Sequence, residues 1–244
     1  MCNKYEAPQA LDIEREWNVS ARSPLRVWSL ELHPLRIGPF VKPRGDLESG
    51  QWGLIPQKSE TNIPRTREGK RMSTNNARDD RIATAWTYRF PWAKGQRCLI
   101  PASNFTEPYW GLHEKHIPWR FKRADGHPWA LAGIWSEWVD PATGEVLPNF
   151  SLITQNVDAH LLLKLMHKPD KKLSAENQDK RGVVPVERED WDAWLHGTID
   201  QARGLIKLPS VEVFEHGPED STVKVALDLA TGEPIVERDP TSLF

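Results

Sequence analysis

Cysteine is scarce in this chain, and long apolar runs are missing from it. Only two cysteines occur among 244 residues, which argues against a disulfide scaffold and excludes a four-cysteine zinc site. No apolar run approaches the roughly 20 residues that a membrane-spanning helix needs. Residues 1–17 also lack the apolar core of a signal peptide. We therefore expect a protein of the cytosol or the nucleus that has no membrane partner.

A strong charge of one sign is also absent, because the formal net charge is -2. The distribution of the charges says more than their sum, since basic residues gather in two segments and the chain after Val211 is mainly acidic. A basic face on a neutral body is compatible with binding to a phosphate backbone, and equally with two solvated loops. The basic residues are Arg65, Arg67, Lys70 and Arg71 in the first segment, and Lys164, Lys168, Lys171, Lys172, Lys180 and Arg181 in the second.

Proline is frequent, at 20 residues, which breaks the chain into short elements and argues against long helices. Apolar residues at 129–139 predict a buried strand, a turn follows at 140–144, and residues 150–154 predict a second strand. Together these segments predict an antiparallel hairpin. Residues 97–103 predict another short strand, in which Cys98 is a buried thiol without chemistry.

Two helices are expected. The first begins near Asn156 or Asp158 as its cap and buries three leucines. The second covers residues 187–197, places two tryptophans and a leucine on one face, and ends at Gly197. Short strands with a few short helices predict a compact, β-rich α+β fold. The buried residues are Leu161, Leu162 and Leu165 in the first helix, and Trp191, Trp194 and Leu195 in the second.

Cys2 is the position with the most distinctive chemistry. If Met1 is removed, Cys2 carries a thiol and a free α-amine on adjacent carbons. An α-amine has a pKa of roughly 7.7–8.0, so an appreciable fraction is neutral and nucleophilic at cellular pH. Such a group condenses with an aldehyde to an imine, which the thiol closes into a thiazolidine. Taken alone, however, position 2 favours the simpler interpretation, an incidental cysteine in a mobile terminus.

Five segments, taken in order, relate the chain to a known family. They are MCNKY, QWGLIP (51–56), NNARDD (75–80), RCLIPASNFTEPYW (97–110) and LMHKP (165–169). In this combination the chain resembles the SOS-response-associated peptidase (SRAP) family from Met1 to about Trp194. The resemblance implies a compact β-rich fold with a central DNA-binding groove and removal of Met1 by autoproteolysis. It also implies a stable crosslink between Cys2 and the ring-opened aldehyde of an abasic site in single-stranded DNA.

The resemblance assigns roles to four residues. Cys2 matches the nucleophile, and Asn76 matches the asparagine that orients it, although Asn75 competes for that register. Glu107 matches the acid after the Cys-Leu-Ile-Pro strand, and His167 matches the family histidine. We expect Glu107 to take a proton from the α-amine and His167 to protonate the sugar oxygen. Without the family context, Asn76 is also a turn residue, Glu107 a solvated charge, and His167 a helix cap.

DNA contacts are expected from cations along the phosphates and from aromatic rings on which bases stack. The candidates are Lys4, Trp52, Arg78, Arg65, Arg67 and Arg71. Trp52 is alternatively a core residue at the start of a strand. The expected partner is single-stranded DNA with abasic sites, bound by a monomer without metal or other cofactor. The expected location is the cytoplasm, with association to the nucleoid in a bacterium, or the nucleus in a eukaryote.

Several positions depart from the family pattern. Asn3 and Lys4 replace a Gly-Arg pair, and lysine lacks the bidentate fork that suits a phosphate. Thr106 and Pro108 flank Glu107 where aromatic residues are usual, and a polar insertion follows His167. Beyond Trp194 the resemblance fades. We therefore expect an SRAP-like domain at residues 1–210 and an acidic extension at 211–244, which packs on that domain, folds back on the groove, or binds a partner.

Three other function classes stay open. The first is a non-covalent binder of single-stranded DNA, and the second is an N-terminal-nucleophile cysteine peptidase or amidohydrolase that uses Cys2. The third is a metalloenzyme whose ligands come from a histidine-rich segment, although the same segment also reads as an exposed loop. Its ligands would be His113, Glu114, His116 and His127.

Overall fold

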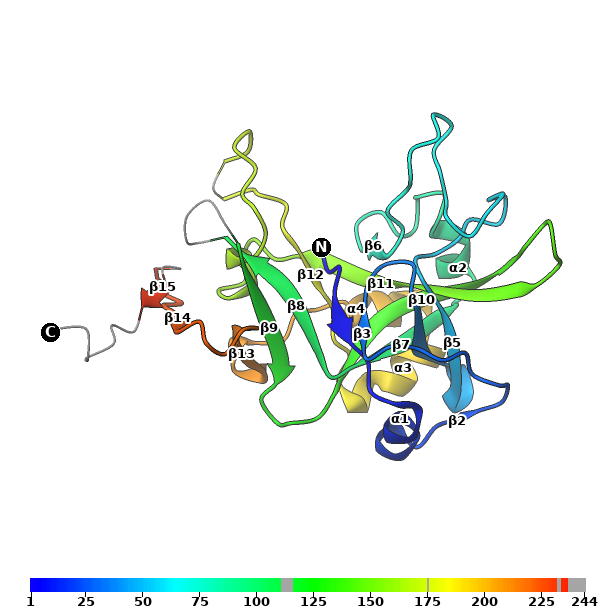
Figure 1. Cartoon of the computed structure of the whole chain (residues 1–244), viewed down its shortest axis with the longest axis horizontal. Coiled ribbons are helices and arrows are strands. Elements are labelled where there is room, and N and C mark those ends of the chain that lie inside the picture. The colour runs from blue at the N-terminus through cyan, green and yellow to red at the C-terminus, as the bar shows by residue number, and fades with distance from the viewer. Residues whose placement is uncertain (111–115, 175, 232–233, 237–244) are drawn as a thin grey trace, which may run out of the picture.

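Strands between residues 5 and 218 form two sheets at the centre of the molecule, and the last two strands form a separate small sheet at its edge, as seen in the computed structural model (Figure 1). The structure describes residues 1–110, 116–174, 176–231 and 234–236. The strands are β1 (Tyr5–Glu6), β2 (Ser20–Ala21), β3 (Glu31–Leu32), β4 (Ile37–Lys42), β5 (Asp46–Trp52), β6 (Asn76–Arg78), β7 (Arg97–Ala102), β8 (Asn104–Tyr109), β9 (Ile117–Arg123), β10 (Trp129–Val139), β11 (Val146–Asn156), β12 (Arg181–Val183), β13 (Phe214–Pro218), β14 (Val225–Leu227) and β15 (Pro234–Val236).

The larger sheet closes on itself. Its order is β12-β11-β10-β7-β4-β5-β2, and β11 also pairs in parallel with β5 and with β6. A closed barrel is therefore formed by β11, β10, β7, β4 and β5. Each of these five strands is paired on both sides within the barrel. The smaller sheet has the order β13-β9-β8-β1-β3. It brings the N-terminal β1 into contact with β8, and it places the C-terminal β13 at its far edge.

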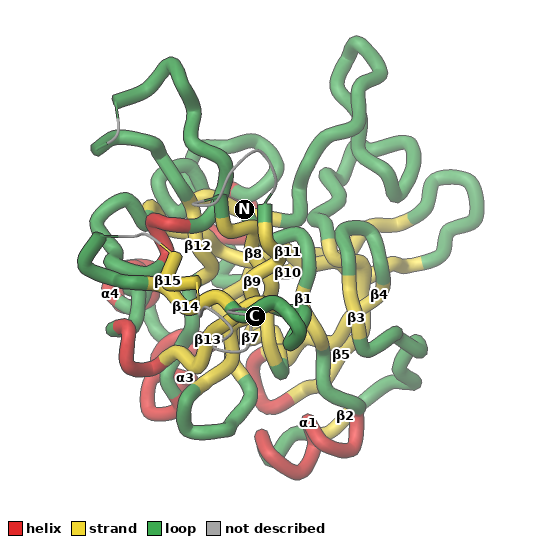
Figure 2. The backbone as a smooth tube through the Cα atoms, turned by 60° about the vertical axis from the view of Figure 1, so that its left-hand side comes forward, coloured by secondary structure: helices red, strands yellow, loops and turns green. Residues whose placement is uncertain are grey.

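Short helices lie around the strands, as Figure 2 shows in red. α3 ends before Gly197, with Trp194 fully buried, which confirms the predicted helix at residues 187–197. The arrangement confirms a β-rich α+β fold. Among the described residues, no helix is long and apolar enough to cross a membrane. The helices are α1 (Ala10–Trp17), α2 (Arg89–Ala93), α3 (Trp191–His196) and α4 (Ile199–Gly204), with 3₁₀ turns η1 (Pro43–Gly45), η2 (Leu163–Leu165), η3 (Arg188–Asp190) and η4 (Val211–Val213).

The predicted hairpin is confirmed. β10 pairs antiparallel with β11, from Gly133 opposite Leu152 to Val139 opposite Val146. β7 lies on the other side of β10, and its Cys98 is fully buried, as expected for a core thiol. Apolar periodicity and turn residues are both local signals here, so the pairing could be predicted from the sequence.

The predicted helix after Asn156 is wrong. Only the short turn η2 forms there, and Leu161 is exposed. The Asp158 carboxylate accepts the backbone N–H groups of residues 179 and 180 at 2.7 and 3.0 Å rather than capping a helix. The His160 ring accepts the N–H groups of residues 162 and 163. Side chains that bind nearby backbone groups compete with helix formation in this way.

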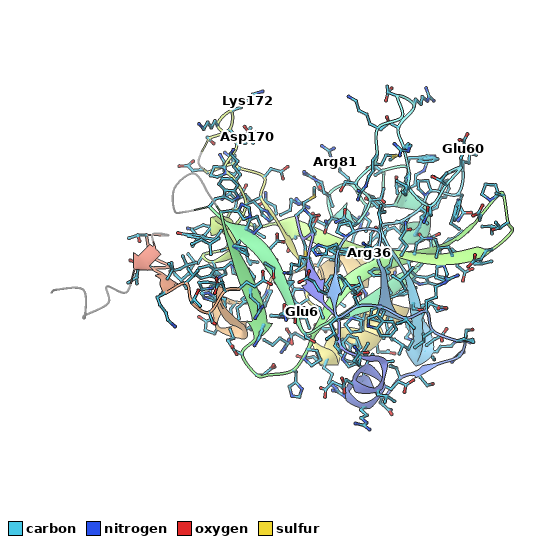
Figure 3. The ribbon with its side chains drawn as sticks, in the orientation of Figure 1. Glu6, Arg36, Glu60, Arg81, Asp170 and Lys172 are labelled. Carbon is cyan, nitrogen blue, oxygen red and sulfur yellow. The ribbon has the colours of Figure 1, made fainter. Side chains whose placement is uncertain are left out.

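Two loops project from the molecule on the side where the chain begins. One contains residues 59–72, and the other contains residues 168–174 and 176–180; Figures 1 and 2 both show the N-terminus between them. Figure 3 places Asp170 and Lys172 on the second loop and Arg81 in the region between the two loops. The fold therefore presents the N-terminal residues at the base of two projecting segments, both of which carry exposed basic side chains.

Gly133 lies where β7, β10 and β11 meet, and there is no room for a side chain. A Cβ atom at this position would lie 2.5 Å from Ile100 Cδ1 and 3.0 Å from the Ser151 carbonyl oxygen. We expect Gly133→Ala to lower the free energy of unfolding by about 1–3 kcal/mol, as overpacked cores do. Gly217→Ala is the matched control, because nothing lies within 4 Å of its Cβ position. Urea titration of both variants measures the difference; equal stabilities would contradict the packing described here.

Candidate active site at the N-terminus

Two neighbouring amides hold the backbone carbonyl of Cys2. Asn76 Nδ2 donates to it at 2.7 Å and Asn75 Nδ2 at 3.1 Å. β6 fixes both side chains, because Asn76 lies opposite Leu152 of β11 and the Asn75 carbonyl accepts the Leu152 N–H. Asn76 Oδ1 is buried and has no hydrogen-bond partner among the described residues. The pair of amides therefore positions Cys2, and one acceptor at the site stays available.

The Cys2 side chain is fully buried. It lies in a core cluster with Tyr5 and Trp52, and Sγ donates to the Lys4 carbonyl at 3.3 Å. Burial raises the pKa of the Cys2 thiol, and the charge of Glu107 raises it further. The thiol is therefore protonated near neutral pH and needs a base before it can act as a thiolate.

Glu107 is a buried carboxyl group on β8 without a hydrogen bond to either oxygen among the described residues. Only 2% of it is exposed, and Oε2 lies 3.3 Å from His167 Nε2. Burial raises the pKa of Glu107 to about 7, although the positive N-terminal amino group pulls it the other way. Both the acid and the carboxylate are therefore populated near neutral pH, as a group that exchanges protons requires.

This carboxyl group should make stability depend on pH. Because the pKa of Glu107 is raised from 4.5 to about 7 by folding, ionisation destabilises the folded state. The contribution of Glu107 to stability should fall as pH rises from about 4.5 to about 7, by up to about 3 kcal/mol, and then level off. His167, whose pKa is lowered from 6.5 to about 3, changes stability in the opposite sense over part of this range. The contribution of Glu107 is therefore obtained as the difference between the native protein and Glu107→Gln. Glu107→Gln should remove this fall and be the more stable protein at about pH 8. Thermal unfolding across this range measures it; parallel curves for the two proteins would contradict it.

His167 lies beside both Glu107 and the N-terminal amino group. The Met1 nitrogen lies 2.9 Å from Nε2 and 3.1 Å from Nδ1 of the ring. The His167 backbone has a left-handed φ of 63° and its N–H donates to the Pro108 carbonyl at 2.6 Å. Burial lowers the pKa of His167 to about 3, and the amino charge contributes in the same direction. The imidazole is therefore neutral near pH 7, with one nitrogen as donor and the other as acceptor.

A cavity of about 510 Å³ opens beside these groups. Met1, Lys4, Glu107, His167 and Glu219 contribute to its wall. The structure thus brings together Cys2, Asn76, Glu107 and His167, which are spread over most of the sequence. The carboxyl of Glu107 and the imidazole of His167 line this cavity, and the buried Cys2 lies between Met1 and Asn3, which line it too. A cysteine next to a proton-exchanging carboxyl and a neutral imidazole is suited to covalent chemistry.

The sequence also matches a family model across most of its length. The model, described as SOS response associated peptidase (SRAP), matches residues 1–223. The chain belongs to the SRAP family. This match extends past residue 210 and includes β13, which pairs with β9 and completes the smaller sheet of the SRAP fold.

Relatives with names and relatives with solved structures are both distant. Two are called abasic site processing protein HMCES: the Gallus gallus protein is 28% identical over 135 residues, and the Pongo abelii protein 25% over 129 residues. These matches cover 48% and 43% of this chain but only 38% and 36% of the relatives. A crystal structure from Bordetella bronchiseptica is 26% identical with a TM-score of 0.76, covering 89% of this chain and 99% of its own. A second crystal structure, from Bacteroides thetaiotaomicron, is 20% identical with a TM-score of 0.71 and covers 91% of this chain and 94% of its own. At this identity the likeness concerns the fold and not the function.

The cation of the SRAP Asn-Ala-Arg segment is engaged in ion pairs. Arg78 NH1 lies 2.6 Å from Asp179 Oδ2, and NH2 lies 2.8 Å from Asp80 Oδ2. Hydrogen bonds to these carboxylates raise the pKa of Arg78. Asp179 comes from the polar insertion after His167, so a phosphate that binds Arg78 has to compete with this pairing.

Trp52 is not an available stacking surface. Its ring has no exposed area, it packs edge-on against Tyr5 at 4.9 Å, and Nε1 donates to the Asn75 carbonyl at 2.9 Å. The prediction that Trp52 contacts DNA is therefore wrong for this structure, because a buried ring cannot receive a base. Its role is to support Asn75, and the alternative interpretation as a core residue is the correct one.

The basic segment at 65–71 lies on one of the two projecting loops. Arg65, Arg67, Lys70 and Arg71 are all exposed there, and Arg65 and Arg71 bridge the two sides of the loop. Arg65 NH1 donates to the Gly69 carbonyl at 2.8 Å. The loop therefore carries its cations outward, on the side where Cys2 lies, and their binding to DNA stays a prediction.

The metalloenzyme alternative rested on four residues. His113 and Glu114 lie outside the described residues. His127 is bound to Glu16 at 2.8 Å, whereas His116 belongs to the wall of the cavity at the N-terminus. In the part of the chain that the structure describes, no group of three or more His, Cys, Asp or Glu residues could hold a metal ion.

Two features of the site were missed by the sequence interpretation. Asn75 was considered only as a competitor of Asn76, whereas both amides bind the same carbonyl. The adjacency of the two asparagines is the signal that could have suggested it. Glu219 was counted only as part of an acidic segment, yet it lines the cavity. No local pattern singles it out from the other acidic residues that follow Val211.

Proposed function

We propose that this SRAP protein captures abasic sites in single-stranded DNA by forming a covalent bond to Cys2. The observation that carries the proposal is the placement of the buried Cys2, whose carbonyl accepts from two amides, near a buried carboxyl group that has no hydrogen bond among the described residues. The cavity beside it has space for a sugar and contains the imidazole of His167.

The chemistry begins with hydrolysis of the Met1–Cys2 peptide bond, which consumes one water and exposes the Cys2 α-amine. The amine attacks C1 of the open sugar, and loss of one water gives an imine. Sulfur then adds to the imine carbon while the thiol proton passes to nitrogen, which closes a thiazolidine. Crosslinking therefore joins protein and DNA with the net release of one water.

Glu107 and His167 divide the proton transfers. The Glu107 carboxylate takes a proton from the α-ammonium, since its raised pKa keeps it close in basicity to that amine. Neutral His167 donates an Nε2–H hydrogen bond to the sugar ring oxygen as the ring opens, since the Arg181 carbonyl 3.1 Å away keeps the proton on Nε2. The proton itself comes from Glu107 once that carboxyl is protonated, because its Oε2 lies 3.3 Å from Nε2. Asn76 Oδ1, which has no hydrogen-bond partner within the described part of the chain, accepts a hydrogen bond from the amine or from a sugar hydroxyl.

Incubation with single-stranded DNA that carries one abasic site tests the proposal. Intact protein mass first establishes whether Met1 is gone, and a denaturing gel then separates free DNA from the adduct. We expect a shifted band with the abasic oligonucleotide and none with the same oligonucleotide undamaged. Adduct mass should equal protein plus DNA less one water.

The other outcomes distinguish the alternatives. Processed protein that binds the DNA under native conditions but yields no denaturation-resistant band would overturn the proposal in favour of a non-covalent binder. Turnover of a peptide or amide substrate without DNA, again with no crosslink, would instead favour an N-terminal-nucleophile peptidase or amidohydrolase.

A further inference from the structure

Glu219 lies directly after β13, and its carboxylate points to the cavity. The backbone N–H of Glu219 donates to the carbonyl of Pro118 in β9 at 2.8 Å, and this bond fixes Glu219 beside that strand. Its Oε1 lies 2.6 Å from Lys4 Nζ and 3.4 Å from Arg120 NH2. Glu219 thus bridges two cations that approach from β9 and from the N-terminal segment.

Lys4 is held by a second carboxylate. Its Nζ lies 2.8 Å from Glu31 Oε2, and Glu31 in turn contacts His33 at 2.9 Å. Burial tends to lower the pKa of Lys4, but the hydrogen bonds that Lys4 donates to Glu219 and Glu31 outweigh it and raise the pKa. The lysine is charged, and that charge is already matched by carboxylates.

Lys4 and Glu219 line the same cavity as Glu107 and His167. A DNA strand with its sugar at Cys2 has to pass a phosphate close to this wall. Lys4 belongs to this wall, and both Lys4 and Arg120 are paired to the Glu219 carboxylate, so a phosphate and Glu219 compete for the same donors. Arg120 Nε, which is buried and has no hydrogen-bond partner among the described residues, is a further donor at this place.

We propose that Glu219 sets the affinity of the site for single-stranded DNA by competing with a backbone phosphate for Lys4 and Arg120. This inference rests on the proposed function, because it takes the strand to bind at the Cys2 cavity. It concerns non-covalent binding, however, so it is measured on intact DNA that contains no abasic site and forms no crosslink.

Glu219→Gln removes the competing charge and preserves the size of the side chain and the backbone bond to Pro118. We expect it to tighten binding of intact single-stranded DNA by about three- to fivefold at low salt, the upper part of the range for single charge pairs near a surface. One additional cation becomes available to a phosphate, so the plot of log K against log salt should steepen by about 0.7. That slope is a measure that a merely structural change would leave unaltered.

Glu215→Gln is the matched control, because Glu215 is exposed on β13, four residues before Glu219, and its replacement changes the net charge equally. We expect this control to bind DNA within about twofold of the native protein, as exposed charges contribute little. In a Lys4→Gln background, most of the gain from Glu219→Gln should disappear. Fluorescence anisotropy over a salt series measures all five proteins.

Equal affinities and slopes for Glu219→Gln and Glu215→Gln would overturn the inference, and so would a full gain in the Lys4→Gln background. Absence of any binding to intact DNA by both the native and the Glu219→Gln proteins would overturn it as well. The crosslinking assay is independent of these results: an adduct without a Glu219 effect refutes only this inference. A Glu219 effect without an adduct refutes only the covalent function.

Discussion

Replacing Cys2 with serine is expected to eliminate the denaturation-resistant adduct while leaving the affinity for intact single-stranded DNA within about twofold. The α-amine remains after removal of Met1, so an imine with the sugar aldehyde can still form. A hydroxyl is a far weaker nucleophile than a thiol and does not trap that imine stably. The imine hydrolyses on the denaturing gel, unless it is first reduced to an amine with borohydride.

The measurement compares gels with and without borohydride, after the mass of each protein has shown that Met1 is absent. Cys98→Ala is the control, because Cys98 is the other thiol and lies fully buried in β7. It should crosslink like the native protein. An adduct that survives denaturation in Cys2→Ser, or that disappears in Cys98→Ala, would show that the thiol of Cys2 is not the trapping group.

Replacing Glu107 with glutamine is expected to slow crosslinking by about 10²–10⁴-fold, the usual contribution of a positioned acid or base. In the native protein the rate should rise as pH rises through about 7, because the carboxylate is the form that accepts the proton. Glutamine has the same shape but cannot take up a proton. The variant should therefore lose the rise near pH 7 as well as the rate.

Single-turnover rates on both sides of neutral pH measure this prediction, with DNA in excess so that binding is saturated. Glu137→Gln, an exposed position on β10, is the control for a general change in charge and should behave as the native protein does. A variant that is slow but keeps the native pH profile would assign the titration near pH 7 to another group. A variant with native rates would remove Glu107 from the chemistry.

Local patterns predicted the fold well where a single segment contained all the information. The hairpin of β10 and β11 and the helix α3 follow from periodicity and from turn residues within the segment itself. The helix expected after Asn156 fails where Asp158 binds the backbone N–H groups of residues 179 and 180. Those partners lie more than 20 residues away in the sequence, so apolar spacing alone could not reveal them.

The site was only partly predictable for a similar reason. Cys2, Asn76, Glu107 and His167 were selected through family resemblance, since each of them alone has an ordinary interpretation. The ion pairs of Arg78 with Asp179 and of Lys4 with Glu219 join segments more than 100 residues apart. No sequence pattern reports such partners, and they change what those cations are free to bind. Trp52 shows the opposite error: its place in a family motif suggested a DNA contact, whereas its ring is buried in the core.

β11 pairs with β10, β12, β5 and β6, so one strand supports the barrel wall and the segment that holds Cys2. Asn75 and Asn76 are bonded to β11, and β11 also pairs with β10 and β5 of the closed barrel. Releasing the two asparagines would therefore require opening the barrel. Amide hydrogens along this strand should therefore exchange with solvent only when the whole molecule opens. On heating, the geometry around Cys2 should persist up to the melting transition and then vanish with it, rather than loosening by degrees beforehand.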